Sequence, residues 1–145
     1  MSSRNWLQRG WLQNHRSSRE EIRDLLGIAD RDLKAAQTAG LPGDWRFSIA
    51  YNAALQAATA ALAAAGYRAA RENHHVRVIG SLEFTTGSNA QLIRTLDAFR
   101  KKRNASNYQV AGVVSNQEAT EMLELAAHLR TEVAEWIRAK HPQLL

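Results

Sequence analysis

The chain reads DWRFSIAYNAALQAATAALAAAG from Asp44 to Gly66. Apolar residues recur here every three or four positions, which is the spacing of one face of an α-helix. This face is formed by Phe47, Tyr51, Ala54, Leu55, Ala58, Leu62 and Ala65. We expect Asp44 to cap the start of the helix and Gly66 to end it. Because alanine side chains are small, the helix can approach its neighbours closely, either inside a bundle or across a dimer.

The composition favours the same class of fold. The 145 residues include 25 alanines, eight glycines, two prolines and no cysteine. Alanine is the strongest helix former, and so few turn residues argue against an all-β fold. Without cysteine the chain has no disulfide, no thiolate zinc site and no cysteine nucleophile. The length is about that of one domain.

Capping residues and apolar spacing predict further helices on both sides of this one. Two are long and begin with an S-x-x-E capping box, and another long one begins with the related S-x-x-Q box. A fourth, short helix is expected over about residues 74–84. The long helices are predicted to begin at Ser17 or Ser18, at Ser88 and at Ser115. The sequence therefore predicts an all-α fold, an up-and-down bundle of about five helices with no persistent sheet.

Residues 1–16 are interpreted as a basic leader that contains Trp6 and Trp11, and residues 17–141 as the helical bundle domain. The two tryptophans are expected either to dock on the domain or to bind a partner. The most apolar window, Ala53–Ala65, is too short to span a bilayer, and the first residues lack the apolar core of a signal peptide. We therefore expect a cytoplasmic protein without a membrane partner.

The formal net charge of +5 is unevenly distributed along the chain. The run Arg100–Arg103 contributes four positive charges, and three arginines of the leader contribute three more. The rest of the chain is slightly acidic. A local basic cluster of this kind is typical either of a contact with phosphate or nucleic acid, or of a solvated helix end.

The sequence lacks the common signatures of an enzyme: it has no H-E-x-x-H motif, no glycine-rich phosphate loop and no G-x-S-x-G motif. His74 and His75 are adjacent, so on a helix their side chains point about 100° apart. We interpret them as packing or helix-start residues rather than metal ligands. No metal site and no cofactor are predicted.

The segment from Arg100 to Tyr108 reads RKKRNASNY and contains the remaining candidate ligand-binding residues. The Arg103 guanidinium can grip a phosphate with two hydrogen bonds, and the Asn104 amide can both donate and accept. Tyr108 offers a hydroxyl and a ring for stacking. The predicted phosphate-binding residues are Arg100, Lys101, Lys102, Arg103 and Asn104. This combination could bind a phosphate of RNA or of a nucleotide.

Three segments together resemble the HEPN superfamily, a group of helical nucleotide-binding domains. They are residues 44–55, residues 66–68 with His74 and His75, and residues 100–108. The resemblance extends over about residues 18–140. It implies a bundle of about five helices that is often dimeric. In active members it implies a metal-independent ribonuclease, in which an arginine orients the scissile phosphate and a histidine farther along helps the 2′-hydroxyl attack.

The resemblance places the motif arginine at Arg103, but Tyr108 stands where the histidine is expected. It therefore makes Arg103 and Tyr108 the candidate catalytic pair. A tyrosine, whose ordinary pKa is about 10, is a poor general base at pH 7. We accordingly expect little or no RNA cleavage by the protein, and whether it is an enzyme stays open.

Three interpretations of function remain open. The chain is a HEPN-like domain that binds RNA or a nucleotide, or that partners a nucleotidyltransferase in a toxin–antitoxin or defence system. Alternatively, it is an active metal-independent HEPN ribonuclease toxin. The third interpretation is a helical adaptor or dimerisation protein with no nucleic-acid role. The resemblance also implies a homodimer, with a nucleotidyltransferase or an antitoxin as a possible partner.

Overall fold

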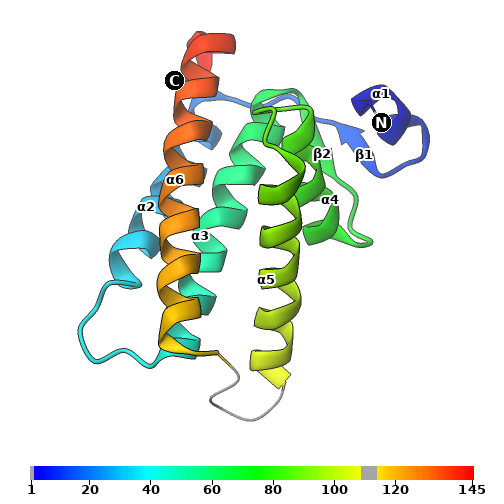
Figure 1. The fold of residues 1–145 in the computed structure, drawn as a ribbon. Coiled ribbons are helices and arrows are strands. Elements are labelled where there is room, and N and C mark those ends of the chain that lie inside the picture. The colour runs from blue at the N-terminus through cyan, green and yellow to red at the C-terminus, as the bar shows by residue number, and fades with distance from the viewer. Residues whose placement is uncertain (1, 109–113) are drawn as a thin grey trace.

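The computed structural model describes residues 2–108 and 114–145, and for residues 105–108 it describes the backbone alone. Four long helices run along the molecule, with one short helix beside them (Figure 1). The long helices are α2 (Arg19–Ala35), α3 (Gly43–Ala64), α5 (Ala90–Tyr108) and α6 (Asn116–Lys140). The short helix α4 (His74–Gly80) continues into a 3₁₀ turn, η1 (Ser81–Glu83). The predicted all-α helical bundle is confirmed.

Helix α3 lies at the centre of the bundle and packs against α2, α4, α5 and α6. The sequence predicts a single apolar stripe, but the helix is buried on almost every side. Seven of its alanines are fully buried within one chain: Ala50, Ala53, Ala54, Ala57, Ala58, Ala60 and Ala61. These alanines serve close packing inside the bundle. Neither α3 nor any other helix in the described ranges combines the length and apolar character needed to cross a bilayer.

Two predicted capping residues lie at helix starts as expected. The Ser18 hydroxyl accepts a hydrogen bond from the backbone N–H of Glu21 at the start of α2, with a donor–acceptor distance of 3.1 Å. At the start of α6, Ser115 and Glu118 form a complete capping box, in which each side chain accepts from the other residue's backbone N–H. These bonds satisfy amide groups that have no partner within the helix.

Two other predicted caps are wrong. Helix α3 begins after Pro42, and Asp44 lies in its first turn without making a capping hydrogen bond. Its carboxylate still interacts favourably with the positive end of the helix dipole. Before α5, the side chain of Asn89 accepts from a first-turn backbone N–H at 2.8 Å. Ser88 instead shares a hydrogen bond with Thr86, because the chain turns one residue later than the pattern indicates.

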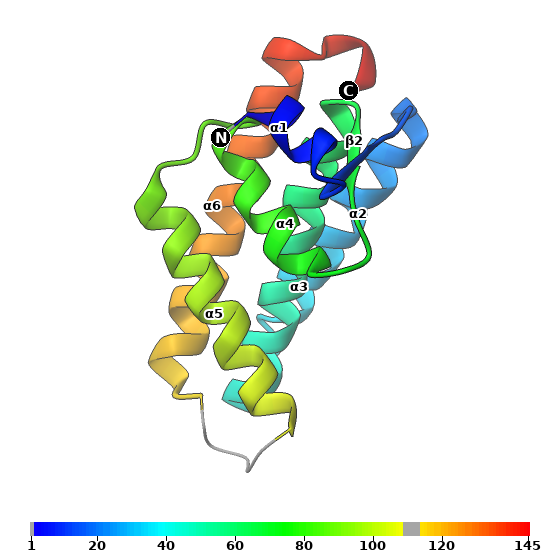
Figure 2. The same cartoon turned by 90° about the vertical axis from the view of Figure 1, so that its right-hand side faces the viewer.

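The prediction of no persistent sheet needs a correction. After helix α1 (Ser3–Gln8), strand β1 (Leu12–Asn14) pairs antiparallel with β2 (Tyr67–Ala69). Helix α1 and both strands lie near the end of the molecule where α3 ends and α5 begins, and α4 lies beside α3 (Figure 1 and Figure 2). The sequence did not predict these strands because three residues are too few to show the alternation of apolar and polar side chains. Their pairing also joins residues that are far apart in the sequence. The chain closes with a 3₁₀ turn, η2 (Pro142–Leu144).

The tryptophans of residues 1–16 dock on the domain. Trp6 is 8% exposed and meets Trp11 and Phe84 edge to face. The guanidinium carbon of Arg77, on α4, lies 3.6 Å from the centroid of the Trp11 ring, which is a cation–π contact. Trp6 also lies directly against Gly80. The domain boundary between residues 16 and 17 stays a prediction.

Gly80 tests how tightly the leader packs. A Cβ atom at this position would lie 2.9 Å from Cη2 of Trp6, closer than van der Waals contact. We expect Gly80→Ala to lower the free energy of unfolding by about 1–3 kcal/mol, as overpacking does. Gly27→Ala is the matched control, because a Cβ there meets nothing within 4 Å and should stabilise α2 by about 0.5–1 kcal/mol. Urea unfolding measures both, and a Gly80→Ala protein as stable as wild type would contradict this packing.

Candidate phosphate-binding site

Side chains from three helices meet around Tyr51, which lies on α3 and is 1% exposed. Its hydroxyl oxygen is 3.3 Å from Nδ1 of His75, on the first turn of α4. The guanidinium carbon of Arg103, on α5, lies 5.4 Å from the centroid of the Tyr51 ring. From the sequence, Arg103 was singled out by its motif. Tyr51 was assigned to the core and His75 to packing or a helix start, and both also lie in the segments that carry the family resemblance. No sequence spacing predicts that the three meet.

The backbone before α4 sets the position of His75. Asn73 has a φ of 54°, in the left-handed region that asparagine tolerates better than most residues. Helix α4 begins directly after it, and the rings of His74 and His75 meet edge to face with their centroids 6.1 Å apart. His74 is exposed and lies 3.2 Å from the carbonyl oxygen of Ala70, whereas His75 is half-buried against Tyr51. Within the described part of the chain, no group of three or more metal-ligating side chains comes together.

Three of the four predicted cations already have acidic partners. Arg100 Nε donates to Oδ1 of Asp97 at 2.8 Å, and Nζ of Lys101 lies 3.8 Å from Oδ2 of the same residue. Nζ of Lys102 lies 3.2 Å from Oε2 of Glu118 and so joins α5 to α6. The two carboxylates, Asp97 and Glu118, offset two of the four positive charges of the run.

Arg103 differs from its three neighbours. Its Nε is buried and has no hydrogen-bond partner among the described residues, and no carboxylate among them forms an ion pair with it. Residues 109–113, which lie outside the described residues, contain neither Asp nor Glu. A buried donor without an acceptor costs about 1–3 kcal/mol, so Arg103 carries an unsatisfied nitrogen as well as an unpaired charge among the described residues. Arg103 is therefore the cation in this cluster that is best placed to receive a phosphate.

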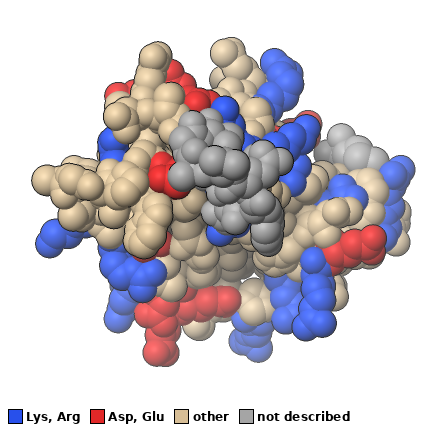
Figure 3. Space-filling view, turned by 90° about the horizontal axis from the view of Figure 1, so that it is seen from below, with Lys and Arg blue, Asp and Glu red and all other residues tan. Residues whose placement is uncertain are grey.

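Asn104 is exposed and follows Arg103 towards the end of α5. The side chain of Tyr108 lies outside the described residues, so its predicted pairing with Arg103 stays a prediction. The end of the molecule where α5 stops is shown in Figure 3. Lys and Arg side chains surround this face, with Asp and Glu between them.

Burial and the nearby arginines fix the charge states of the two partners. Burial raises the pKa of Tyr51 to about 12, although Arg103 and Arg100 oppose the change. The pKa of His75 is lowered, first by burial and then by the positive charge of Arg103, with smaller effects from His74 and Arg100. At neutral pH Tyr51 therefore keeps its proton, and His75 is uncharged.

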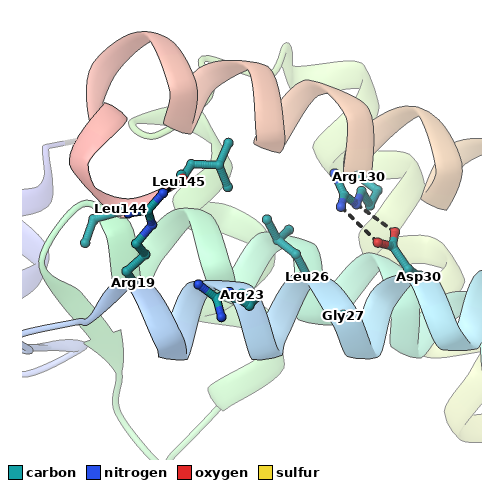
Figure 4. Close-up of a pocket in the computed structure, with 8 residues that line it drawn as sticks. All are labelled: Arg19, Arg23, Leu26, Gly27, Asp30, Arg130, Leu144 and Leu145. Atoms are coloured by element: carbon teal, nitrogen blue, oxygen red, sulfur yellow. Dashed lines mark hydrogen bonds and ion pairs between the residues drawn. The ribbon is translucent and has the colours of Figure 1, made fainter.

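A separate pocket of about 350 Å³ lies between α2, α6 and the last residues of the chain (Figure 4). Arg19 donates to the carbonyl oxygen of Leu145 at 2.9 Å. Arg130 donates two hydrogen bonds to the carboxylate of Asp30, at 2.8 and 2.9 Å. Arg19 thus joins α2 to the C-terminal residue Leu145, and Arg130 joins α6 to α2.

Comparison with protein families agrees with this assignment of the fold. A sequence model of the HEPN domain matches residues 22–136, a range that contains Tyr51, His75 and Arg103. The chain therefore belongs to the HEPN family, as the resemblance indicated. The role of this family is related to nucleotides or RNA. No curated protein matches the chain.

The titration of His75 tests the geometry of the cluster. We expect its NMR midpoint to lie below the ordinary value of about 6.5, because burial and Arg103 both lower the pKa. Arg103→Gln removes one of these causes, so the midpoint should rise while staying below 6.5. Lys101→Gln is the control, because Lys101 is not among the groups that shift this pKa. An unchanged midpoint in Arg103→Gln would contradict the closeness of the two side chains.

The same shift makes folding stability depend on pH. The pKa of His75 is lower in the folded protein than in the unfolded chain. Between these two pKa values the unfolded chain therefore binds more protons. The contribution of His75 to stability is therefore complete above pH 6.5 and is lost as the pH falls towards the folded-state pKa. We expect wild type to lose more stability than His75→Gln in urea unfolding between pH 7 and pH 5. Equal losses would show that His75 is not buried as described.

Proposed function

We propose that this HEPN domain binds a phosphate group of RNA or of a nucleotide at Arg103. The observation that carries the proposal is the imbalance within the basic run. Arg100, Lys101 and Lys102 have acidic partners, whereas Arg103 has none among the described residues and a buried Nε without an acceptor. A phosphate bound to the guanidinium of Arg103 would supply the negative partner that the described residues lack.

The surroundings of Arg103 support an anion rather than a solvated helix end. Its guanidinium lies against the ring of the buried Tyr51, which limits the orientations that the side chain can adopt. Partial burial weakens screening by water, so the attraction for an anion is stronger than at an exposed lysine. These features argue against an adaptor whose basic run serves only solubility.

The remaining partners stay predictions. A homodimer rests on the family alone, because the alanines of α3 that also favoured it from the sequence are buried inside a single chain. A nucleotidyltransferase or antitoxin partner, a toxin–antitoxin or defence role, and a cytoplasmic location likewise rest on the resemblance and on composition. Light scattering at tens of micromolar tests the dimer directly, and a monomer alone would contradict it.

The proposal is tested by comparing two cations of the same run. Arg103→Gln should weaken binding of a labelled single-stranded RNA by about 1–3 kcal/mol, the usual range for a charge-assisted hydrogen bond. Lys101→Gln should change affinity less at moderate salt and mainly lower the slope of log K against log salt, by about 0.7. Fluorescence anisotropy at several salt concentrations measures both quantities. Equal effects would reduce the run to a nonspecific basic patch, and no binding by wild type would contradict the proposal.

A further inference from the structure

The leader and α4 line a small polar pocket of about 200 Å³. Its lining residues are Arg9, Gly10 and Trp11 of the leader, then Ala70, Glu72, Asn73 and Arg77. Tyr51, His75 and Arg103 are not among them, so the pocket is separate from the candidate site described above. Pockets that hold a whole small molecule usually measure about 300–1,000 Å³, so this one suits a single small group.

Trp11 orients two arginines at this pocket. The guanidinium carbon of Arg77 lies 3.6 Å from the centroid of the Trp11 ring, and that of Arg9 lies 4.9 Å from it. The carbonyl oxygen of Trp11 accepts a hydrogen bond from the Ala70 N–H at 2.9 Å, just after β2, which fixes the backbone of the tryptophan. A cation–π contact uses the face of a guanidinium, whereas its hydrogen-bond donors point outward in its plane. Both arginines are thus held over one ring with donors available for a ligand.

Neither of these arginines has an acidic partner in the protein. No carboxylate forms an ion pair with Arg9 or Arg77 among the described residues, which include every Asp and Glu of the chain. In the same part of the chain, Nε of Arg77 is buried without a hydrogen-bond partner. Two like charges over one ring repel each other, and an anion between them would turn this repulsion into attraction.

We propose that this pocket is a second anion site, which binds one phosphate monoester between Arg9 and Arg77. A monoester carries a charge of about −1.5 to −2 at pH 7 and three terminal oxygens, so it can balance and engage two arginines. A carboxylate or a phosphodiester carries one charge and offers two such oxygens, which one guanidinium fork already engages. Asn73 lines the pocket as well, and its side-chain amide can add a donor.

The inference goes beyond the proposed function, because it assigns a ligand to the leader and requires no phosphate at Arg103. The docking of the leader then has a consequence for binding. Arg9 comes from the leader and Arg77 from α4, so the pair forms only when the leader is docked. The monoester is either the phosphate of a free nucleotide or the terminal phosphate of an RNA strand.

Of the described residues that line the pocket, Glu72 alone is acidic. Its side chain is exposed and forms no ion pair with either arginine in this part of the chain. The negative charge of Glu72 repels a bound phosphate, so its removal should tighten binding. This direction of change is specific to an anion, because a cationic ligand would respond in the opposite sense.

The test uses the full chain and uridine 5′-monophosphate, with uridine as the control that lacks a phosphate. The reporter is the indole N–H signal of Trp11 in a ¹H–¹⁵N NMR spectrum, assigned by its loss in Trp11→Phe. The monophosphate should shift this signal saturably at about millimolar concentration, whereas uridine, or sodium chloride at matched ionic strength, should not. A signal that shows no saturable response up to about 20 mM would overturn the site.

Charge variants test which residues bind the phosphate, and circular dichroism confirms that each is folded. Arg77→Gln should weaken binding at least about tenfold, because the arginine is half-buried. Arg9→Gln, at an exposed position, should weaken it about two- to fivefold, and Glu72→Gln should strengthen it by up to about fivefold. Arg4→Gln is the matched control, because Arg4 belongs to the leader but does not line the pocket. Equal effects of Arg4→Gln and Arg9→Gln, or weaker binding by Glu72→Gln, would overturn the site.

Two further comparisons separate this site from Arg103 and identify the source of the phosphate. Arg103→Gln should keep the Trp11 response to the monophosphate, so failure of the proposed function and failure of this inference are distinguishable. Loss of the response in Arg103→Gln would overturn a separate site. A 5′-phosphorylated RNA that shifts the Trp11 signal more than its 5′-hydroxyl counterpart would identify an RNA end as a source, and a response to the monophosphate alone would identify a free nucleotide. Equal responses to the two RNAs would overturn the assignment to a monoester.

Discussion

The burial of α3 on almost every side is the constraint on which the rest of the structure depends. Small alanine side chains let four helices pack around one, and few large residues fit between them. Two of those that do, Phe47 and Tyr51, face α5. Phe47 meets Phe99 edge to face at 5.3 Å, and Tyr51 supports Arg103. The helix that forms the core therefore also forms the base of the candidate site.

Acidic residues determine which cation of the basic run is available for a ligand. Asp97 lies one turn before the run and engages Arg100 and Lys101. Glu118 caps α6, and its pKa is lowered first by the backbone hydrogen bond from Ser115 and further by Lys102, so it stays ionised beside that lysine. Among the described residues, Arg103 is then the cation of the run that has no carboxylate within ion-pair distance. The Lys102–Glu118 ion pair thus joins α5 to α6 at the residue before Arg103.

Local patterns predicted the helices well, because capping and apolar spacing involve residues within a few positions of one another. Ser18 and the Ser115 box are examples, and α4 was expected close to where it lies. The strand pair and the meeting of Tyr51, His75 and Arg103 were not predictable in this way, because they join residues that come together only on folding. The motif therefore identified Arg103 but not its partners.

The most direct test of the account is the Nε–H signal of Arg103 in a ¹H–¹⁵N NMR spectrum, assigned by its loss in Arg103→Lys. In the free protein this group has no acceptor among the described residues. If a phosphate occupies the site, the signal should shift saturably as single-stranded RNA is added, with the Kd measured by anisotropy. The Nε–H of Arg100, already bonded to Asp97, should shift less. RNA binding that leaves the Arg103 signal in place would contradict the account.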